Sequence, residues 1–105
     1  MTNTELINKL KTLEGVSVYS VRATLGAKLP YLVVTFGQTD NFVSDNRVTV
    51  KKQAISLELY TEVKDETTEA KVEKLLDDND IPWDKDEAYD DSEQFYINYY
   101  DITRR

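Results

Sequence analysis

Residues 31–36, Tyr-Leu-Val-Val-Thr-Phe, form the most apolar run in the chain, and they stand between Pro30 and Gly37. A run of β-branched and aromatic residues between two residues that interrupt regular structure is typical of a strand buried on both faces. A second such run, from Val16 to Val21, precedes it. We expect these two strands to form the centre of a sheet.

Apolar residues at helical spacing predict two helices, over residues 4–14 and 66–79. Gly15 stands where the first helix is expected to end, and Asp65 stands where the second begins, as a capping residue. Pro82 follows the second helix and limits its extension. The expected buried stripes are Leu6, Ile7, Leu10 and Leu13 in the first helix and Ala70, Val72, Leu75 and Leu76 in the second.

Three more strands are expected in the second half of the chain. In residues 47–61 the apolar side chains change from even to odd positions, which predicts either a bulge near residues 51–54 or different partners for the two halves. Residues 83–89 and 93–102 predict a hairpin around Asp90-Asp91-Ser92. The last strand carries aromatic residues on both faces, so we expect both faces to be covered.

The resulting order α-β-β-β-α-β-β predicts an α+β fold. Most of the strands are joined by short turns, and the order contains no repeated βαβ unit. We therefore expect one α+β domain over residues 1–105, with a mostly antiparallel sheet of about five strands and both helices on one face.

Residues 38–46 have the composition of a turn, although Phe42 and Val43 stand inside the segment. Nine residues are more than an ordinary hairpin connection needs. Either this loop is functional or the flanking strands are longer than their composition suggests. Arg47, Lys51 and Lys52 follow it, and we interpret them as protection of a sheet edge or as partners for acids on a neighbouring subunit.

Charge and composition exclude several classes of protein. The chain has a net charge of −7 and contains neither Cys nor His. A surplus of acids disfavours specific nucleic-acid binding, because contacts to phosphate need Lys and Arg. Cysteine-liganded zinc, disulfides, thiol catalysis and histidine-based triads are impossible within one such chain. We expect no enzyme activity, no cofactor and no metal.

Acidic residues are concentrated between Asp77 and Glu93, where nine of 17 residues are acidic and Lys85 is the only base. This segment carries −8, so the other 88 residues together carry +1. A calcium site is one interpretation, but the glycine and the last glutamate of an EF-hand loop are missing. Paired carboxylates for hydrolysis are another, and nothing distinguishes two of them. The third is a solvated acidic surface that aids solubility or repels a polyanion.

A longer pattern resembles the small neck and tail-completion proteins of long-tailed bacteriophages and prophages of Gram-positive bacteria. It covers roughly residues 29–100 and consists of these segments: Leu29-Pro30-Tyr31, Asp40-Asn41-Phe42, Ser44-Asp45-Asn46, Lys51-Lys52, Leu57-Glu58-Leu59-Tyr60-Thr61, Lys64-Asp65, Glu69, Lys71 to Leu76, Asn79-Asp80-Ile81, Asp91-Ser92-Glu93, Phe95-Tyr96 and Tyr99.

The resemblance implies a virion structural protein of the tail-terminator or head-tail joining type. Such proteins are small α+β subunits that commonly assemble as a hexameric ring and contact other tail or connector proteins. The segment with Phe42 and Val43 would then be a docking arm. Our hypothesis for the acids is that Asp84, Asp86, Asp90 and Asp91 face a channel through which DNA passes, where negative walls prevent adhesion.

A second hypothesis is an acidic DNA mimic that inhibits a host DNA-binding enzyme. Mimics spread acids along a surface, whereas here the acids are confined to 17 residues of sequence. The N-terminal residues show no signal peptide, and no apolar run is long enough for a membrane-spanning helix. We therefore expect a protein made in the host cytoplasm and located in the virion, without membrane contact.

Overall fold

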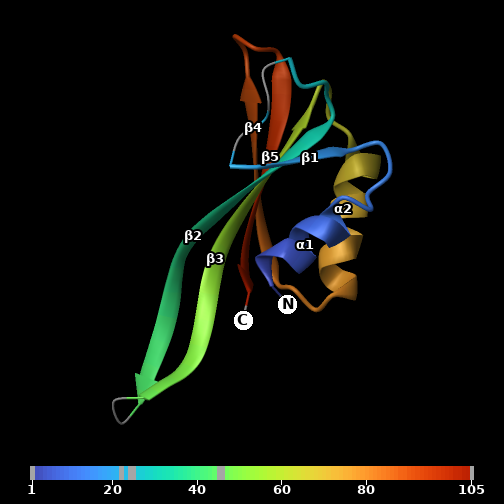
Figure 1. Ribbon diagram of the computed structural model, residues 1–105. Coiled ribbons are helices and arrows are strands. Elements are labelled where there is room, and N and C mark those ends of the chain that lie inside the picture. The colour runs from blue at the N-terminus through green and yellow to red at the C-terminus, as the bar shows by residue number, and fades with distance from the viewer. Residues whose placement is uncertain (1, 22, 24–25, 45–46, 105) are drawn as a thin grey trace.

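The computed structural model describes residues 2–21, 23, 26–44 and 47–104, and of residues 38–44, 47–53, 103 and 104 it describes the backbone alone. Two helices and five strands follow the order expected from the sequence, and the α+β fold is confirmed. Their bounds are α1 (Asn3–Leu10), β1 (Ser17–Ser20), β2 (Tyr31–Ser44), β3 (Arg47–Thr61), α2 (Glu66–Asp78), β4 (Trp83–Asp90) and β5 (Phe95–Arg104). Figure 1 shows the helices together on one side of the sheet.

The five strands form one sheet in the order β1-β2-β3-β5-β4. β1 pairs with β2 in parallel, and the other three pairings are antiparallel. The expectation that the first two strands form the centre is wrong, because β1 lies at an edge and β3 is the middle strand. β1 has only four residues, whereas the 15 residues of β3 are long enough to pair with β2 and β5 together.

Residues 38–44, predicted to belong to a loop, continue β2 instead, and β3 begins at Arg47. The alternative of longer flanking strands is therefore the correct one. β1 pairs with β2 only as far as Val34, and β5 pairs with β3 only as far as Gln53. Residues 38–44 and 47–52, which we call the arm, form a two-stranded ribbon that extends away from the helices (Figure 1).

Two irregularities interrupt the pairing of β2 with β3, and the first lies opposite Ala54, within the predicted region 51–54, although the extra residue belongs to β2. The first lies between Phe36 and Thr39, where β2 has the extra residue opposite Ala54. A Cβ atom at Gly37 would lie 3.3 Å from the Ala54 carbonyl oxygen, so a glycine suits this close approach. The second lies between Phe42 and Val43. The possibility that the two halves of β3 contact different partners stays a prediction.

The hydrophobic core lies between the sheet and the two helices. Leu6 and Leu10 of α1 and Val72 and Leu76 of α2 are fully buried. They pack with every second residue of the central strands, including Leu32, Val34, Ile55, Leu57, Leu59, Tyr100 and Ile102. We call this side of the sheet the helix face and the other side the open face, because α1 and α2 both lie on the first (Figure 1).

The observed ends of the two helices agree with the predicted ends to different extents. α1 ends at Leu10, four residues before the predicted end at residue 14, because the amides of Thr12 and Leu13 bond three residues back, as in a 3₁₀ turn. Gly15 then turns the chain with a φ of +77°. α2 begins after Asp65, whose carboxylate accepts a hydrogen bond from the Thr68 amide, and its predicted stripe is shifted: Ala70 is exposed and Glu69 is buried.

Candidate functional site

The arm carries all five residues for which the sequence predicted intermolecular contacts. Phe42 and Val43 belong to β2, and Arg47, Lys51 and Lys52 belong to β3. The side chains of these residues lie outside the described part of the structure, which places only their backbone. A two-stranded ribbon without a third strand is marginally stable in water, so a surface that covers the arm would stabilise it.

The open face carries a row of aromatic side chains that the sequence did not identify as a group. Tyr31 and Tyr60 are register partners on β2 and β3, and their rings stack with centroids 4.7 Å apart. Tyr19 of β1 contacts Tyr31 edge-on at 6.0 Å, and Phe95 of β5 contacts Tyr60 at 5.1 Å. All four rings are half-buried. The rings shield the strand residues beside them, so that Val33 is only 4% exposed without any helix on this side.

A carboxylate lies beside this aromatic row. The hydroxyl of Tyr60 donates a hydrogen bond to Glu58 Oε2 at 3.3 Å. Burial, the charge of Glu58 and this hydrogen bond together raise the pKa of Tyr60 to about 12. Burial and the same charge raise the pKa of Tyr31 as well. Both tyrosines therefore stay neutral at physiological pH, and the aromatic row adds no charge to that of Glu58.

The remainder of the open face is acidic. Asp84 of β4 and Asp101 of β5 are cross-strand partners, and Asp86 follows on β4 opposite Tyr99. These three aspartates are exposed, and none has an ion pair with any described residue. Among the described open-face side chains there is no Lys or Arg. Like charges directly opposite one another destabilise a sheet, so this pair is a cost to the isolated chain.

A hollow of about 320 Å³ lies at the base of the arm, next to these acids. Thr35 and Ser56 line it from the central strands, and Asp84 and Asp101 line it from the edge. Gly37, at the irregularity of β2, lines the hollow at the point where the arm leaves the body. The acids of the open face therefore lie close to the start of the arm of their own chain, which points away from them (Figure 1).

The four aspartates predicted to form one acidic surface fall into two groups. Asp84 and Asp86 lie on the open face. Asp90 shares this face by register, opposite Phe95, but it lies at the other end of β4, about 20 Å from Asp84 at 3.3 Å per residue, and Asp91 follows it in the turn. The Asp90 carboxylate accepts hydrogen bonds from the Ser92 hydroxyl at 2.7 Å and the Glu93 amide at 3.1 Å, which lower its pKa and fix the turn. Asp90 thus has a structural role.

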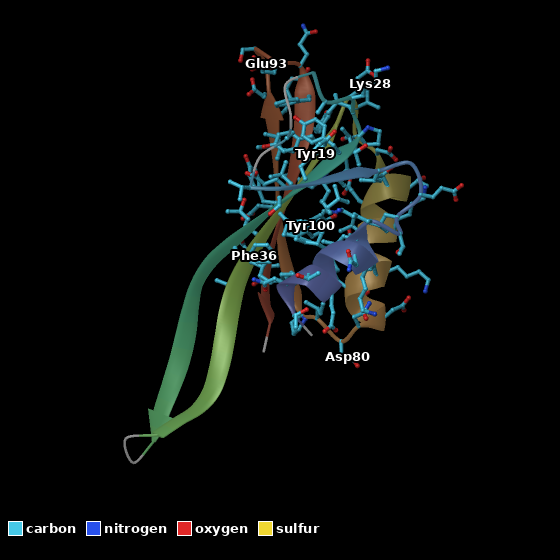
Figure 2. The ribbon with its side chains drawn as sticks, viewed as in Figure 1. Tyr19, Lys28, Phe36, Asp80, Glu93 and Tyr100 are labelled. Carbon is cyan, nitrogen blue, oxygen red and sulfur yellow. The ribbon has the colours of Figure 1, made fainter. Side chains whose placement is uncertain are left out.

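The acidic segment as a whole runs along the length of the body. Asp80 follows α2, and Glu93 lies in the turn between β4 and β5. Figure 2 shows these two residues at opposite ends of the part of the molecule that contains the helices. Several acids between them have local partners: Asp77 accepts from the Trp83 indole at 2.9 Å, and Asp78 pairs with Lys74 at 2.7 Å. The sequence concentrates these acids, but the fold distributes them.

A second polar cluster lies on the helix face and was also missed by the sequence analysis. Glu69 of α2 is 2% exposed, and its Oε1 accepts hydrogen bonds from Lys85 of β4 and from Lys64 at 3.0 Å. Lys85 also contacts Glu73 Oε2 at 3.0 Å, and the Tyr100 hydroxyl donates to the same oxygen at 2.8 Å. This cluster joins α2 to two strands.

The charges of this cluster stabilise one another. Burial alone would raise the pKa of Glu69, but the hydrogen bonds from Lys85 and Lys64 outweigh it and lower that pKa below the ordinary value. Burial alone would lower the pKa of Lys85, but its bonds to Glu69 and Glu73 raise that pKa. Both groups are therefore charged at neutral pH, and we interpret the cluster as structural.

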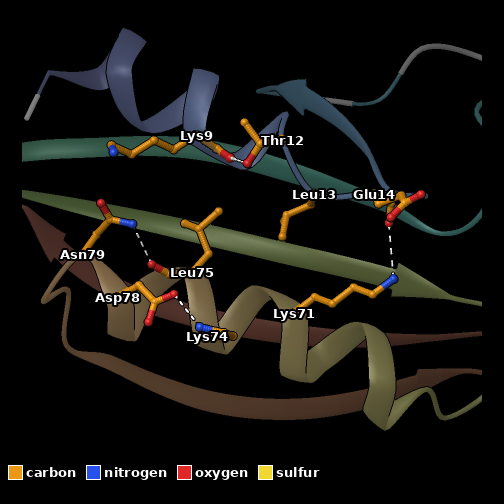
Figure 3. A pocket seen from close by; sticks show the side chains of 9 residues that line it. All are labelled: Lys9, Thr12, Leu13, Glu14, Lys71, Lys74, Leu75, Asp78 and Asn79. Carbon is orange, nitrogen blue, oxygen red and sulfur yellow. Dashed lines mark hydrogen bonds and ion pairs between the residues drawn. The ribbon is translucent and has the colours of Figure 1, made fainter.

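An open groove of about 550 Å³ separates the C-terminal end of α1 from α2 (Figure 3). Leu13 and Leu75 line it, with lysines around them. Lys74 is held by Asp78, and Lys71 donates to the Glu14 carbonyl oxygen at 3.4 Å. These side chains bond to the groove's own walls, and nothing in the groove identifies a ligand.

Two further kinds of feature are absent from the part of the chain that the structure describes: a cluster of metal-ligating residues and a membrane-spanning helix. Within those residues no group of three or more His, Cys, Asp or Glu is placed to hold a metal ion. Neither α1 nor α2 is long and apolar enough to cross a membrane, and they are the only helices among the described residues.

Comparison with known proteins adds no family. No family model matches this sequence, and no curated protein matches it.

Proposed function

We propose that this protein is a structural subunit of the neck of a long-tailed bacteriophage, acting as a tail terminator or a head-tail joining protein. In this role it assembles into a ring through contacts between copies and also contacts other tail or connector proteins. The observation that carries the proposal is the arm, a ribbon that extends beyond every strand able to support it.

A subunit that forms rings needs two unlike surfaces that fit each other. Contacts between unlike surfaces close into a ring when the rotation from one copy to the next permits it. The arm projects from one end of the sheet, and the open face lies on the body (Figure 1). The chain therefore presents two separate surfaces, each of which is incomplete alone. The phage assignment rests in addition on the resemblance in residues 29–100.

Electron microscopy of virions made without this protein tests the proposed function. We expect full heads beside separate tails if the protein joins the two, or tails of uncontrolled length if it terminates them. Virions of normal shape and infectivity would overturn both roles.

A variant without the arm provides the matched control. In this variant the dipeptide Asn-Gly replaces residues 38–53. Asn-Gly then forms a two-residue hairpin turn between Gly37 and Ala54. This variant keeps the helices and the rest of the sheet, so we expect it to fold. It should fail to restore the virions that the intact protein restores. Full restoration by the armless variant would show that the arm is dispensable for this role.

The alternative of a DNA mimic has less support from the fold. Of the nine acids in residues 77–93, Asp77 and Asp78 have partners in Trp83 and Lys74, and Asp90 has its partners in a turn, which makes these three less available to a basic groove. Competition with duplex DNA for a host nuclease or repressor would distinguish it. Displacement of the duplex by this protein would favour the mimic over the ring subunit.

A further inference from the structure

We infer that the arm of one copy lies across the open face of the next copy, with its β3 half against Glu58, Asp84, Asp86 and Asp101. This inference deepens the proposed function and rests on it, since it names the partner of the arm and the surface that receives it. Three features of the chain support it: charge, apolar character and dimensions.

The charges of the two surfaces are opposite. The part of the open face next to the arm carries the carboxylates of Glu58, Asp84, Asp86 and Asp101, and the described side chains of this face include no cation. The arm contains Arg47, Lys51 and Lys52 and one acid, Asp40, which is the register partner of Lys52, so residues 38–44 and 47–52 together carry a net charge of +2. Opposite charges on two surfaces direct association and fix register, and they suppress contact of a surface with its own copy. Two open faces would repel each other, so the acidic face selects the arm.

The apolar parts also correspond. The open face exposes parts of a row of four aromatic rings, Tyr19, Tyr31, Tyr60 and Phe95. The arm contains the apolar residues Phe42, Val43, Val48 and Val50. A contiguous apolar surface of this kind is typical of an interface, and the arm supplies apolar residues in the same segment as its cations.

The dimensions match. The seven residues 38–44 span about 23 Å at 3.3 Å per residue. The open face of a five-stranded sheet is about 19 Å wide, from four spacings of about 4.8 Å. The arm is therefore long enough to cross all the strands of a neighbouring copy.

The contact must be between copies and not within one. β2 and β3 run without interruption from the body into the arm, and the arm points away from the body (Figure 1). Each copy thus gives its arm to one neighbour and receives the arm of another. In this arrangement Asp84 and Asp86 contact protein and do not line a channel for DNA.

Charge exchange between the two surfaces tests this inference. The face variant is Asp84→Lys with Asp86→Lys, and the arm variant is Lys51→Glu with Lys52→Glu. Sedimentation or light scattering should show that each variant associates at least about tenfold more weakly than the unchanged protein. An equimolar mixture of the two should regain association, because each arm then meets a face of opposite charge.

The matched control is Asp78→Lys with Asp91→Lys, which makes the same change of charge outside the open face. We expect it to associate like the unchanged protein. Rings that form normally from the face variant, or a mixture that regains nothing, would overturn the inference and leave the ring function intact. An unchanged protein that stays monomeric up to about 1 mM would also overturn the inference, while virions made without the protein decide the function separately.

Discussion

Lys85 of β4 and Tyr100 of β5 are cross-strand partners, and both donate a hydrogen bond to the same atom, Oε2 of Glu73 on α2, at 3.0 Å and 2.8 Å. Lys85 also contacts Glu69, and its Nζ lies 5.8 Å from the centre of the Tyr100 ring. One lysine on an edge strand thus connects that strand, its neighbour and the helix above them.

We expect Lys85→Met to lower the free energy of unfolding by about 2–3 kcal/mol, because it removes the cation shared by two carboxylates, one of them buried. Methionine keeps most of the apolar stem, so the loss reports the charge. Urea unfolding followed by circular dichroism measures the change. The control is Lys74→Met, in an exposed pair with Asp78, which should change the free energy by less than about 0.5 kcal/mol. Equal losses in the two variants would contradict a special role of Lys85.

The acid limit of stability should depend on Glu69. The folded-state pKa of Glu69 is lower than its ordinary value of 4.5, so the stabilisation is fully present above pH 4.5 and is lost as the pH falls through the folded-state pKa. In Glu69→Gln this part of the pH dependence should disappear, and the variant should be less stable than the unchanged protein at pH 7. Urea midpoints at several pH values between 7 and 3 measure both effects. Parallel curves for the two proteins would show that Glu69 does not titrate as we expect.

The sequence predicts α2 well because its signals are local. Asp65 caps the helix through Thr68, three residues away, and the apolar spacing covers a single face. The burial of Glu69 has no such local signal, since Lys64 and Lys85 come to it from outside the helix. A carboxylate at a buried helix position therefore looks in the sequence like any exposed acid.

The acidic surface of the open face has no local signal in the sequence either, because its residues come from different strands. Glu58 and Asp101 lie outside the acid-rich segment 77–93, yet they share a face with Asp84 and Asp86. Only the register of β3, β5 and β4 brings these residues together. The period-2 alternation of each strand gives its two faces, but it does not tell which faces of different strands coincide. The sequence predicted a loop in place of the β2 half of the arm, because residues 38–44 are mostly polar and their composition is typical of turns.

Substitutions in the arm and in the core should separate assembly from folding. Phe42→Ser and Val43→Ser should leave the melting temperature of the isolated chain nearly unchanged and weaken assembly, since the arm adds little to the core. Leu57→Ser, at a fully buried position, should cost at least about 3 kcal/mol and unfold the domain, and Val33→Ser should do the same. Thermal melts and light scattering on both pairs test this. Unfolding caused by the arm substitutions would show that the arm supports the fold.

The hydroxyl of Tyr60 should titrate well above the ordinary tyrosine pKa of 10.0. Its pKa is about 12 because of burial, of the charge of Glu58 and of the hydrogen bond to it. We expect Glu58→Gln to lower this pKa towards 10, since it removes the second and weakens the third of these causes. Ring resonances followed by NMR between pH 8 and 12 measure the shift. An unchanged titration would mean that burial alone sets this pKa.

The facing pair of Asp84 and Asp101 should give the clearest sign that the open face serves assembly. Like charges opposite each other in a sheet are unfavourable, so Asp101→Asn should stabilise the isolated chain by a few tenths of a kcal/mol. The same substitution removes a carboxylate from the surface that we assign to the arm, so assembly should weaken. A substitution that stabilises the subunit and impairs the ring is expected only where the unfavourable pair is retained for a partner. Unfolding and association are measured on the same preparation. A gain in both stability and assembly would show that the pair has no partner on a neighbouring copy.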